Sequence, residues 1–105
     1  MDAKDLLDRV KLNLVISFDD DDKLILTFIN SAITYSESYQ HLDAGYYKEN
    51  EMSETTQQAV VMLSSHFYES RDGSTAGFFS NNTNASEQVW KSVNRLLLLD
   101  RSWKV

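Results

Sequence analysis

The stretch from Ser53 to Arg71, SETTQQAVVMLSSHFYESR, limits most strongly what this chain can fold into. At about 100° per residue, its apolar side chains cover one broad arc of a helix, and others lie nearly opposite. The arc holds Ala59, Val60, Met62, Leu63 and Phe67, with Val61 and Tyr68 opposite. Because only Gln58, Ser65 and Glu69 form a polar strip, this helix must be covered on more than one side. It is therefore either the hub of a helical domain or a helix shared with another subunit.

Both ends of this stretch carry residues that favour helix termini. Ser53 is a suitable N-cap, and Glu54 places an acid in the first turn, where the helix dipole favours negative charge. Arg71 has the charge that favours the opposite end. We therefore expect the central helix to begin and end near these residues.

Three further helices are expected around the central one. Residues 2–11 place their apolar side chains on one face, residues 21–40 form an amphipathic helix of core type, and a last helix begins at about Ser86. Residues 41–52 and 72–85 contain all three glycines and are predicted loops, the second of them flexible. The predicted fold is all-α, a small bundle of about four helices around a central helix.

Residues 12–18 depart from the helical pattern. Their side chains alternate, with Leu12, Leu14, Ile16 and Phe18 on one side. A period of two favours an extended segment. Since a single strand has no pairing partner in a helical chain, we expect an extended linker or a strand added to a neighbouring subunit.

Composition excludes several classes of protein. The length of 105 residues predicts a single domain, residues 1–105. A formal charge of −6 argues against a protein that grips nucleic-acid phosphates. The absence of cysteine excludes disulfides and thiolate metal sites. Because no apolar run reaches the roughly 20 residues that span a bilayer and no signal peptide is recognisable, we expect an intracellular, soluble protein with no membrane partner.

The polar motifs do not assemble into a reactive site. The run Asp19–Asp22 lacks the spaced ligands and the glycine of a calcium loop, so helix capping is the better interpretation. His66 lies on the apolar side of the central helix, far in sequence from His41, which favours a partly buried histidine over a metal ligand. Ser64, Ser65 and His66 are neighbours on a helix and point in different directions. We predict no catalytic, cofactor-binding or metal-binding residues, and no enzyme.

Several large side chains have no helical stripe to join, and these are the candidate contact residues. Aromatic pairs in a polar loop either fold back onto the core or present an anchor to another protein, and both interpretations stay open. A terminal tryptophan near two arginines poses the same choice, and the last two leucines of the final helix fall off its buried face. The candidates are Phe78, Phe79, Arg95, Leu98, Leu99, Arg101 and Trp103.

Three segments together resemble a known family. They are AVVMLSSHFYESRD at 59–72, VKLNLVISFDDDDKLILTFINSAITYSESY at 10–39 and NRLLLLDR at 94–101. Their succession of helices, acidic run and His-aromatic-Tyr-Glu-x-Arg signature is similar to that of the small head-tail connector (adaptor) proteins of long-tailed phages. The likeness extends over roughly three quarters of the chain.

The resemblance implies a structural virion protein that does no chemistry. Connectors of this kind form a homo-oligomeric ring, of about twelve copies, under the portal protein at the head vertex. The ring extends the channel through which DNA passes without specific binding, and it docks head-completion or tail proteins. The implied locations are the virion neck and, during assembly, the host cytoplasm. By this likeness, residues 72–85 and the C-terminal tail reach the portal or the next ring.

Two other functions fit the composition. A small helical phage regulator or protein-interaction module would be monomeric or dimeric and would not bind a portal. An enzyme subunit would show a deep pocket with two or more convergent titratable side chains.

Overall fold

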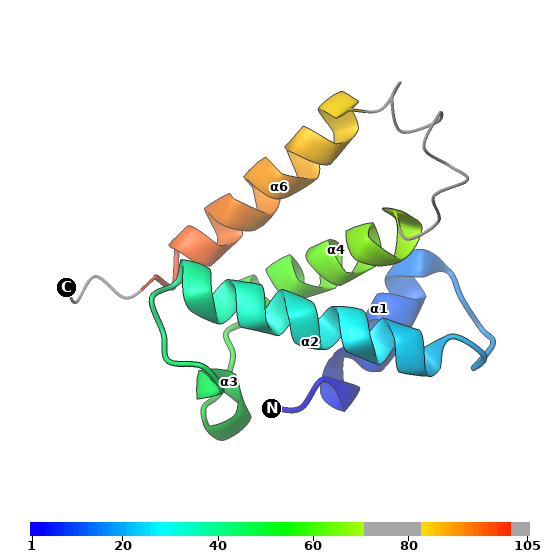
Figure 1. Cartoon of the computed structure of the whole chain (residues 1–105), viewed down its shortest axis with the longest axis horizontal. Helices are drawn as coiled ribbons and strands as arrows, with labels where there is room; N and C mark the ends of the chain where they lie inside the picture. Colours follow the sequence, from blue (N-terminus) through cyan, green and yellow to red (C-terminus); the bar gives the residue numbers. More distant parts are fainter. Residues whose placement is uncertain (71–82, 102–105) are drawn as a thin grey trace.

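The structure is a computed structural model that describes residues 1–70 and 83–101, with side chains from residue 86 onward in the last helix. These residues form five helices, the third of which is a single turn (Figure 1). The helices are α1 (Lys4–Leu14), α2 (Asp22–Tyr39), α3 (Tyr46–Glu49), α4 (Glu54–Ser70) and α6 (Thr83–Leu98). No strand occurs in the described ranges, and the longer helices pack against one another. The predicted all-α bundle is confirmed.

Helix α4 is the hub of the bundle. It contacts α1, α2 and α6, and Figure 1 shows it running between α6 and the pair formed by α1 and α2. Its apolar arc and the opposite side chains Val61 and Tyr68 are both largely buried within one subunit. Even Ser65, expected on the polar strip, is buried, because α1 packs over it. Its hydroxyl oxygen accepts a hydrogen bond from Asn13 Nδ2 of α1 at 2.7 Å. The central helix therefore leaves little surface for a neighbouring subunit.

The other helices pack through stripes with helical spacing. Leu6 and Val10 of α1 are four residues apart and fully buried, as are Ile25 and Ile29 of α2. Burying one such aliphatic side chain stabilises the fold by about 1.5–3 kcal/mol. In α6, Val93 and Leu97 play the same part, and the ring of Trp90 packs against aromatic side chains of α2 and α4. These stripes determine which face each helix packs against the core.

The expectation of an extended segment over residues 12–18 is wrong at its start. Helix α1 continues through Leu14, because Leu14 extends the stripe of Leu6 and Val10 and packs against the core. The helix ends at Val15, which has a left-handed backbone with φ 59°, and the Ile16 N–H donates to the Lys11 carbonyl at 2.9 Å. Of residues 12–18, only residues 16–18 lack helix or turn structure.

Two loop boundaries also differ from expectation. Residues 41–52 contain α3, which follows Gly45 with φ 84°, a backbone conformation that suits glycine. Buried Glu37 of α2 accepts the N–H groups of Gly45 at 3.1 Å and Tyr47 at 2.9 Å, and so holds this turn in place. The last helix begins at Thr83, earlier than expected. Of the predicted flexible loop 72–85, residues 72–82 lie outside the described residues.

A buried polar junction joins four helices near the end of α2. Gln40 is fully buried and donates through Nε2 to Thr56 Oγ1 of α4 at 2.9 Å and to the Leu97 carbonyl of α6 at 3.0 Å. Its Oε1 accepts from the Tyr47 hydroxyl of α3. One side chain thus satisfies polar groups on all three neighbouring helices.

Candidate interaction surfaces

The serine and histidine side chains of α4 serve the helix and its packing. Ser64 and Ser65 donate to the carbonyls four residues earlier, Val60 at 2.7 Å and Val61 at 2.8 Å. The ring of His66 lies beside those of Phe67 and Trp90, with centroids 6.5 and 6.3 Å away. Burial lowers the pKa of His66 below its usual value, and the nearby carboxylate of Glu69 opposes that shift in part. In the described residues, no group of three or more His, Asp or Glu side chains is arranged to hold a metal ion.

A surface hollow of about 430 Å³ lies where the N-terminal end of α1 meets α2 and α3. Its charged lining consists of Asp2, Glu37 and Lys48. Both carboxylate oxygens of Glu37 already accept backbone N–H groups, so this side chain acts as a structural acceptor.

The acidic run ties helices together and does not cap α2 through its side chains. Lys11 Nζ lies 2.8 Å from both Asp19 Oδ1 and Asp22 Oδ1. The hydroxyl of Tyr68 donates to Asp21, which precedes α2 but makes no side-chain capping bond. The ammonium of Lys11 lowers the pKa of Asp19, and the two carboxylates raise the pKa of Lys11. The run therefore fastens the turn between α1 and α2 to its neighbours. The capping prediction is confirmed in position, because Asp21 is the N-cap residue and Asp22 lies in the first turn, but no side-chain capping bond forms.

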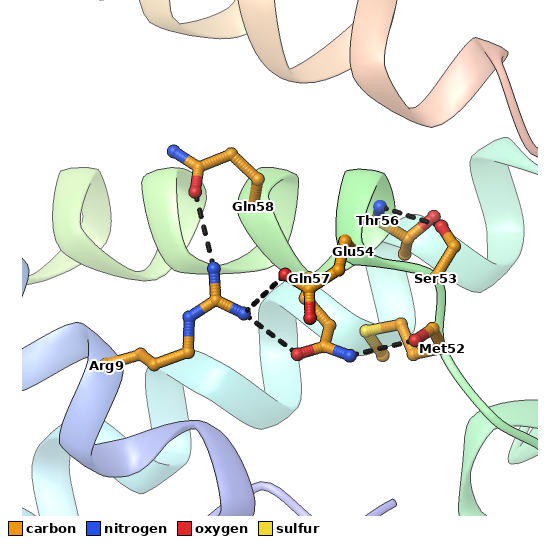
Figure 2. A network of polar contacts seen from close by, with 7 residues as sticks. All are labelled: Arg9, Met52, Ser53, Glu54, Thr56, Gln57 and Gln58. Atoms are coloured by element: carbon orange, nitrogen blue, oxygen red, sulfur yellow. Dashed lines mark hydrogen bonds and ion pairs between the residues drawn. The ribbon is translucent and has the colours of Figure 1, made fainter.

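An arginine clamps α1 onto the start of α4, as Figure 2 shows. Arg9 Nη1 donates to Gln57 Oε1 at 2.8 Å and lies 3.5 Å from Glu54 Oε2, while Nη2 reaches Gln58 Oε1 at 3.5 Å. Gln57 in turn donates to the Met52 carbonyl at 2.8 Å. Because Arg9 lies one turn before the end of α1, the clamp fixes the direction in which that end points.

The end of α1 carries three exposed apolar side chains, which we call the α1 tip: Leu12, Val15 and Phe18. Their exposed fractions are 78%, 91% and 50%. Val15 and His41 are the described residues other than glycine that have a positive φ, 59° and 61°. Val15 is the β-branched one, for which this conformation is a true outlier that costs about 1–3 kcal/mol. A subunit that holds a strained valine almost wholly in solvent gains nothing from that side chain within its own fold.

A second apolar patch lies at the opposite end of the molecule, at the C-terminal end of α6 (Figure 1). Leu98 is 38% and Leu99 is 73% exposed, and Arg95 is exposed one turn earlier. We call these three residues the α6 end.

The α6 end is held by the start of α4. Ser53 accepts the Thr56 N–H at 3.1 Å, which confirms the predicted N-cap. Asp100 in turn accepts the Ser53 hydroxyl and, at 2.9 Å, the Thr56 hydroxyl. Because Asp100 directly follows Leu99, these bonds anchor the chain next to the exposed leucines.

The structure brings together some of the predicted contact residues and separates others. Arg95, Leu98 and Leu99 share the α6 end. Arg101 is directed back onto its own subunit, where Nη2 donates to His41 Nε2 at 2.6 Å and the guanidinium lies 5.5 Å from the ring centroid of Tyr39. Phe78, Phe79 and Trp103 lie outside the described residues.

Sequence reasoning did not place the α1 tip among the contact residues, although it predicted that residues 12–18 are either an extended linker or a strand added to a neighbouring subunit. A usable signal was present. On a helix that buries Leu6 and Val10, Leu12 falls off the buried stripe.

Comparison with known proteins identifies the family. Residues 4–101 match a family model described as Phage gp6-like head-tail connector protein. No curated protein and no solved structure shows a significant match. Among the described residues, no helix has the length and apolar content needed to cross a membrane. The match includes nearly all of the described residues, and members of this family are structural proteins of the virion. The chain therefore belongs to the phage gp6-like head-tail connector proteins.

Proposed function

We propose that this chain is a single-domain connector subunit, residues 1–105, that assembles as a closed ring under the portal. The ring extends the DNA channel and docks head-completion or tail proteins. Its subunits are made in the host cytoplasm and end in the neck of the virion. This proposal gives specific form to the structural role that the family shares.

The observation that supports it is the pair of exposed apolar patches at opposite ends of the subunit. A ring requires a heterologous interface, in which one surface of each copy binds a different surface of the next. The α1 tip and the α6 end are two such surfaces, whereas the apolar sides of α4 are already covered within the subunit.

The size of the patches suggests a weak pairwise contact. Full burial of one large aliphatic or aromatic side chain contributes about 1.5–3 kcal/mol. The five apolar side chains of the two patches, exposed by 38–91%, then supply on the order of 5–10 kcal/mol. Association costs about 4–15 kcal/mol in lost translational and rotational freedom. The balance is close to zero, so isolated subunits should stay monomeric until a portal gathers them at high local concentration.

The charge of the chain suits a wall along a DNA channel. Sixteen acidic residues outnumber ten basic ones, which gives a formal charge of −6. A surface of this sign repels the phosphate backbone, so DNA slides past without binding.

The proposed contact with the portal is inferred from the family resemblance. It involves residues outside the α1 tip and the α6 end. We assign it to residues 72–85 and the C-terminal tail, which include Phe78, Phe79 and Trp103. Arg101 lies at the start of that tail and contacts Tyr39, the last residue of α2, and His41, which lies two residues after that helix. It would therefore orient the tail and contact the portal little itself.

A binding experiment with purified portal tests the proposal. Wild-type subunit alone should sediment as a monomer at micromolar concentration, and native mass spectrometry of the mixture should show many copies bound to each portal. Deleting residues 73–82 should leave helical circular dichroism intact and abolish portal binding, and unchanged binding would reject the role of that loop. A stable dimer with no affinity for portal would favour a small regulatory protein instead.

A further inference from the structure

We infer that the α1 tip of one copy binds the α6 end of the next copy, in head-to-tail order around the ring. This inference rests on the proposed function, because it names the two surfaces that would build the ring. It specifies a contact of Leu12, Val15 and Phe18 against Leu98 and Leu99.

The strained backbone at Val15 is the first argument. Glycine is the ordinary residue at a left-handed helix end, because it has no Cβ to clash. Here the chain places a β-branched side chain in that position with φ 59° and 91% exposure. Strain of this kind clusters at functional sites. A second copy that covers Val15 gives the side chain the apolar contact that its own fold does not supply.

The charged side chains near the two surfaces are the second argument, because they favour the α6 end as the surface that binds the α1 tip. Asp8 is exposed one turn before Leu12, and Asp20 is exposed two residues after Phe18. Lys91 and Arg95 of α6 and Leu99, which directly follows the helix, succeed one another at four-residue spacing, and all three are exposed. None of these four charged side chains forms an ion pair with another residue of the described ranges.

These charges disfavour contacts between identical ends. Two α1 tips would bring Asp8 and Asp20 of both copies together, and two α6 ends would bring Lys91 and Arg95 of both copies together. Lys11 is already paired with Asp19 and Asp22, and Asp100 already accepts two hydroxyl groups of its own subunit, so like charges would dominate both contacts. When the α1 tip of one copy contacts the α6 end of another, the acidic side chains beside the tip face the basic side chains of α6, with the apolar side chains at the centre of the contact. Because the overall charge of −6 makes copies of this chain repel one another, a local pairing of opposite charges favours their association.

Both surfaces are held in place before any contact forms. The Arg9 clamp and the Lys11 ion pairs fix the end of α1. The Gln40 bond to the Leu97 carbonyl and the anchoring of Asp100 fix the end of α6. Surfaces ordered in advance lose little conformational freedom on binding, which suits a small contact.

The first test replaces Val15 with glycine. Relief of the left-handed strain should raise the melting temperature of the isolated subunit by about 2–6 °C. Loss of the side chain should weaken self-association on the portal about tenfold. Ser17→Gly, at an exposed position two residues later in the segment between α1 and α2, is the matched control and should leave self-association unchanged. If Val15→Gly is more stable and assembles as well as wild type, the inference is overturned.

The second test uses engineered cysteines, since the chain contains none. Val15→Cys is combined with Leu98→Cys or with Leu99→Cys in one chain, and oxidation at high protein concentration should give a ladder of cross-linked oligomers. Each single variant, and Val15→Cys combined with Ser31→Cys at an exposed site of α2, should give far less product.

The outcomes separate the two proposals. If rings form on the portal but only like-to-like or background cross-links appear, the pairing is wrong and the proposed function stands. If the ladder forms but no ring assembles on the portal, the pairing stands and the ring proposal falls.

Discussion

Replacing Gln40 with leucine should destabilise the subunit strongly, because Gln40 joins α2 to α3, α4 and α6. The side chain is fully buried and takes part in three hydrogen bonds, two as donor and one as acceptor. Leucine has a similar volume, so the change removes the polar contacts and opens little cavity.

The expected loss follows from these bonds. Each contributes about 0.5–1.5 kcal/mol net, and more where a buried partner is left unsatisfied. The Leu97 carbonyl keeps the N–H of Asp100 at 3.2 Å and Thr56 keeps Asp100 as an acceptor, which limits the penalty. We expect a decrease of about 2–4 kcal/mol in the free energy of unfolding, against a typical total of about 5–15 kcal/mol.

Urea unfolding followed by circular dichroism measures this change. With a slope of about 1–3 kcal/mol per M, the midpoint should fall by roughly 1–3 M. Gln88→Leu is the matched control, since Gln88 is exposed on α6 and should shift stability by less than about 0.5 kcal/mol. A Gln40→Leu variant as stable as wild type would show that the junction does not hold these helices together.

Two further predictions concern pH. Lys11 lowers the pKa of Asp19 below its usual 3.8, so the stability gained from this pair is present above about pH 4 and is lost as the pH falls through the folded pKa. Urea midpoints of wild type and Lys11→Met should therefore differ at pH 7 and converge as the pH falls through the folded pKa of Asp19. A difference that stays constant as the pH is lowered would contradict the role of the pair. Burial lowers the pKa of His66 below 6.5, so the unfolded chain takes up the proton first and stability should decline as the pH falls below about 6.5. An NMR titration of the folded protein should give a midpoint below 6.5, His66→Gln should remove this decline, and a midpoint at or above 6.5 would refute the assignment.

The sequence predicted the helices that bury regular stripes and missed features that depend on one backbone angle. Helix α4 follows from its own apolar pattern and from the Ser53 cap. The alternation of Leu12, Leu14 and Ile16 predicted an extended segment, yet Leu14 also continues the helical stripe of Leu6 and Val10. Helix α1 ends at Val15, which has a left-handed backbone. A glycine at this position would have indicated a helix end in the sequence, and a valine does not.

Contacts between distant segments were beyond sequence reasoning. Arg101 is a predicted contact residue, and its hydrogen bond to His41, sixty residues earlier, could not be predicted from the sequence. The run Asp19–Asp22 was expected to cap α2, but Lys11 and Tyr68 bind three of its four carboxylates. In both cases the residue type was informative and the partner depended on the packing of the bundle. The α6 end was predictable, because Leu98 and Leu99 continue past the stripe that buries Val93 and Leu97.

Hydroxyl-radical footprinting of the free and the portal-bound subunit tests the central claim most directly, because it reports the solvent exposure of individual side chains. We expect strong oxidation of Leu12, Val15, Phe18 and Leu99 in the free subunit and marked protection of all four once copies gather on the portal. Equal oxidation of these side chains in the free and the bound protein would show that neighbouring copies do not cover them.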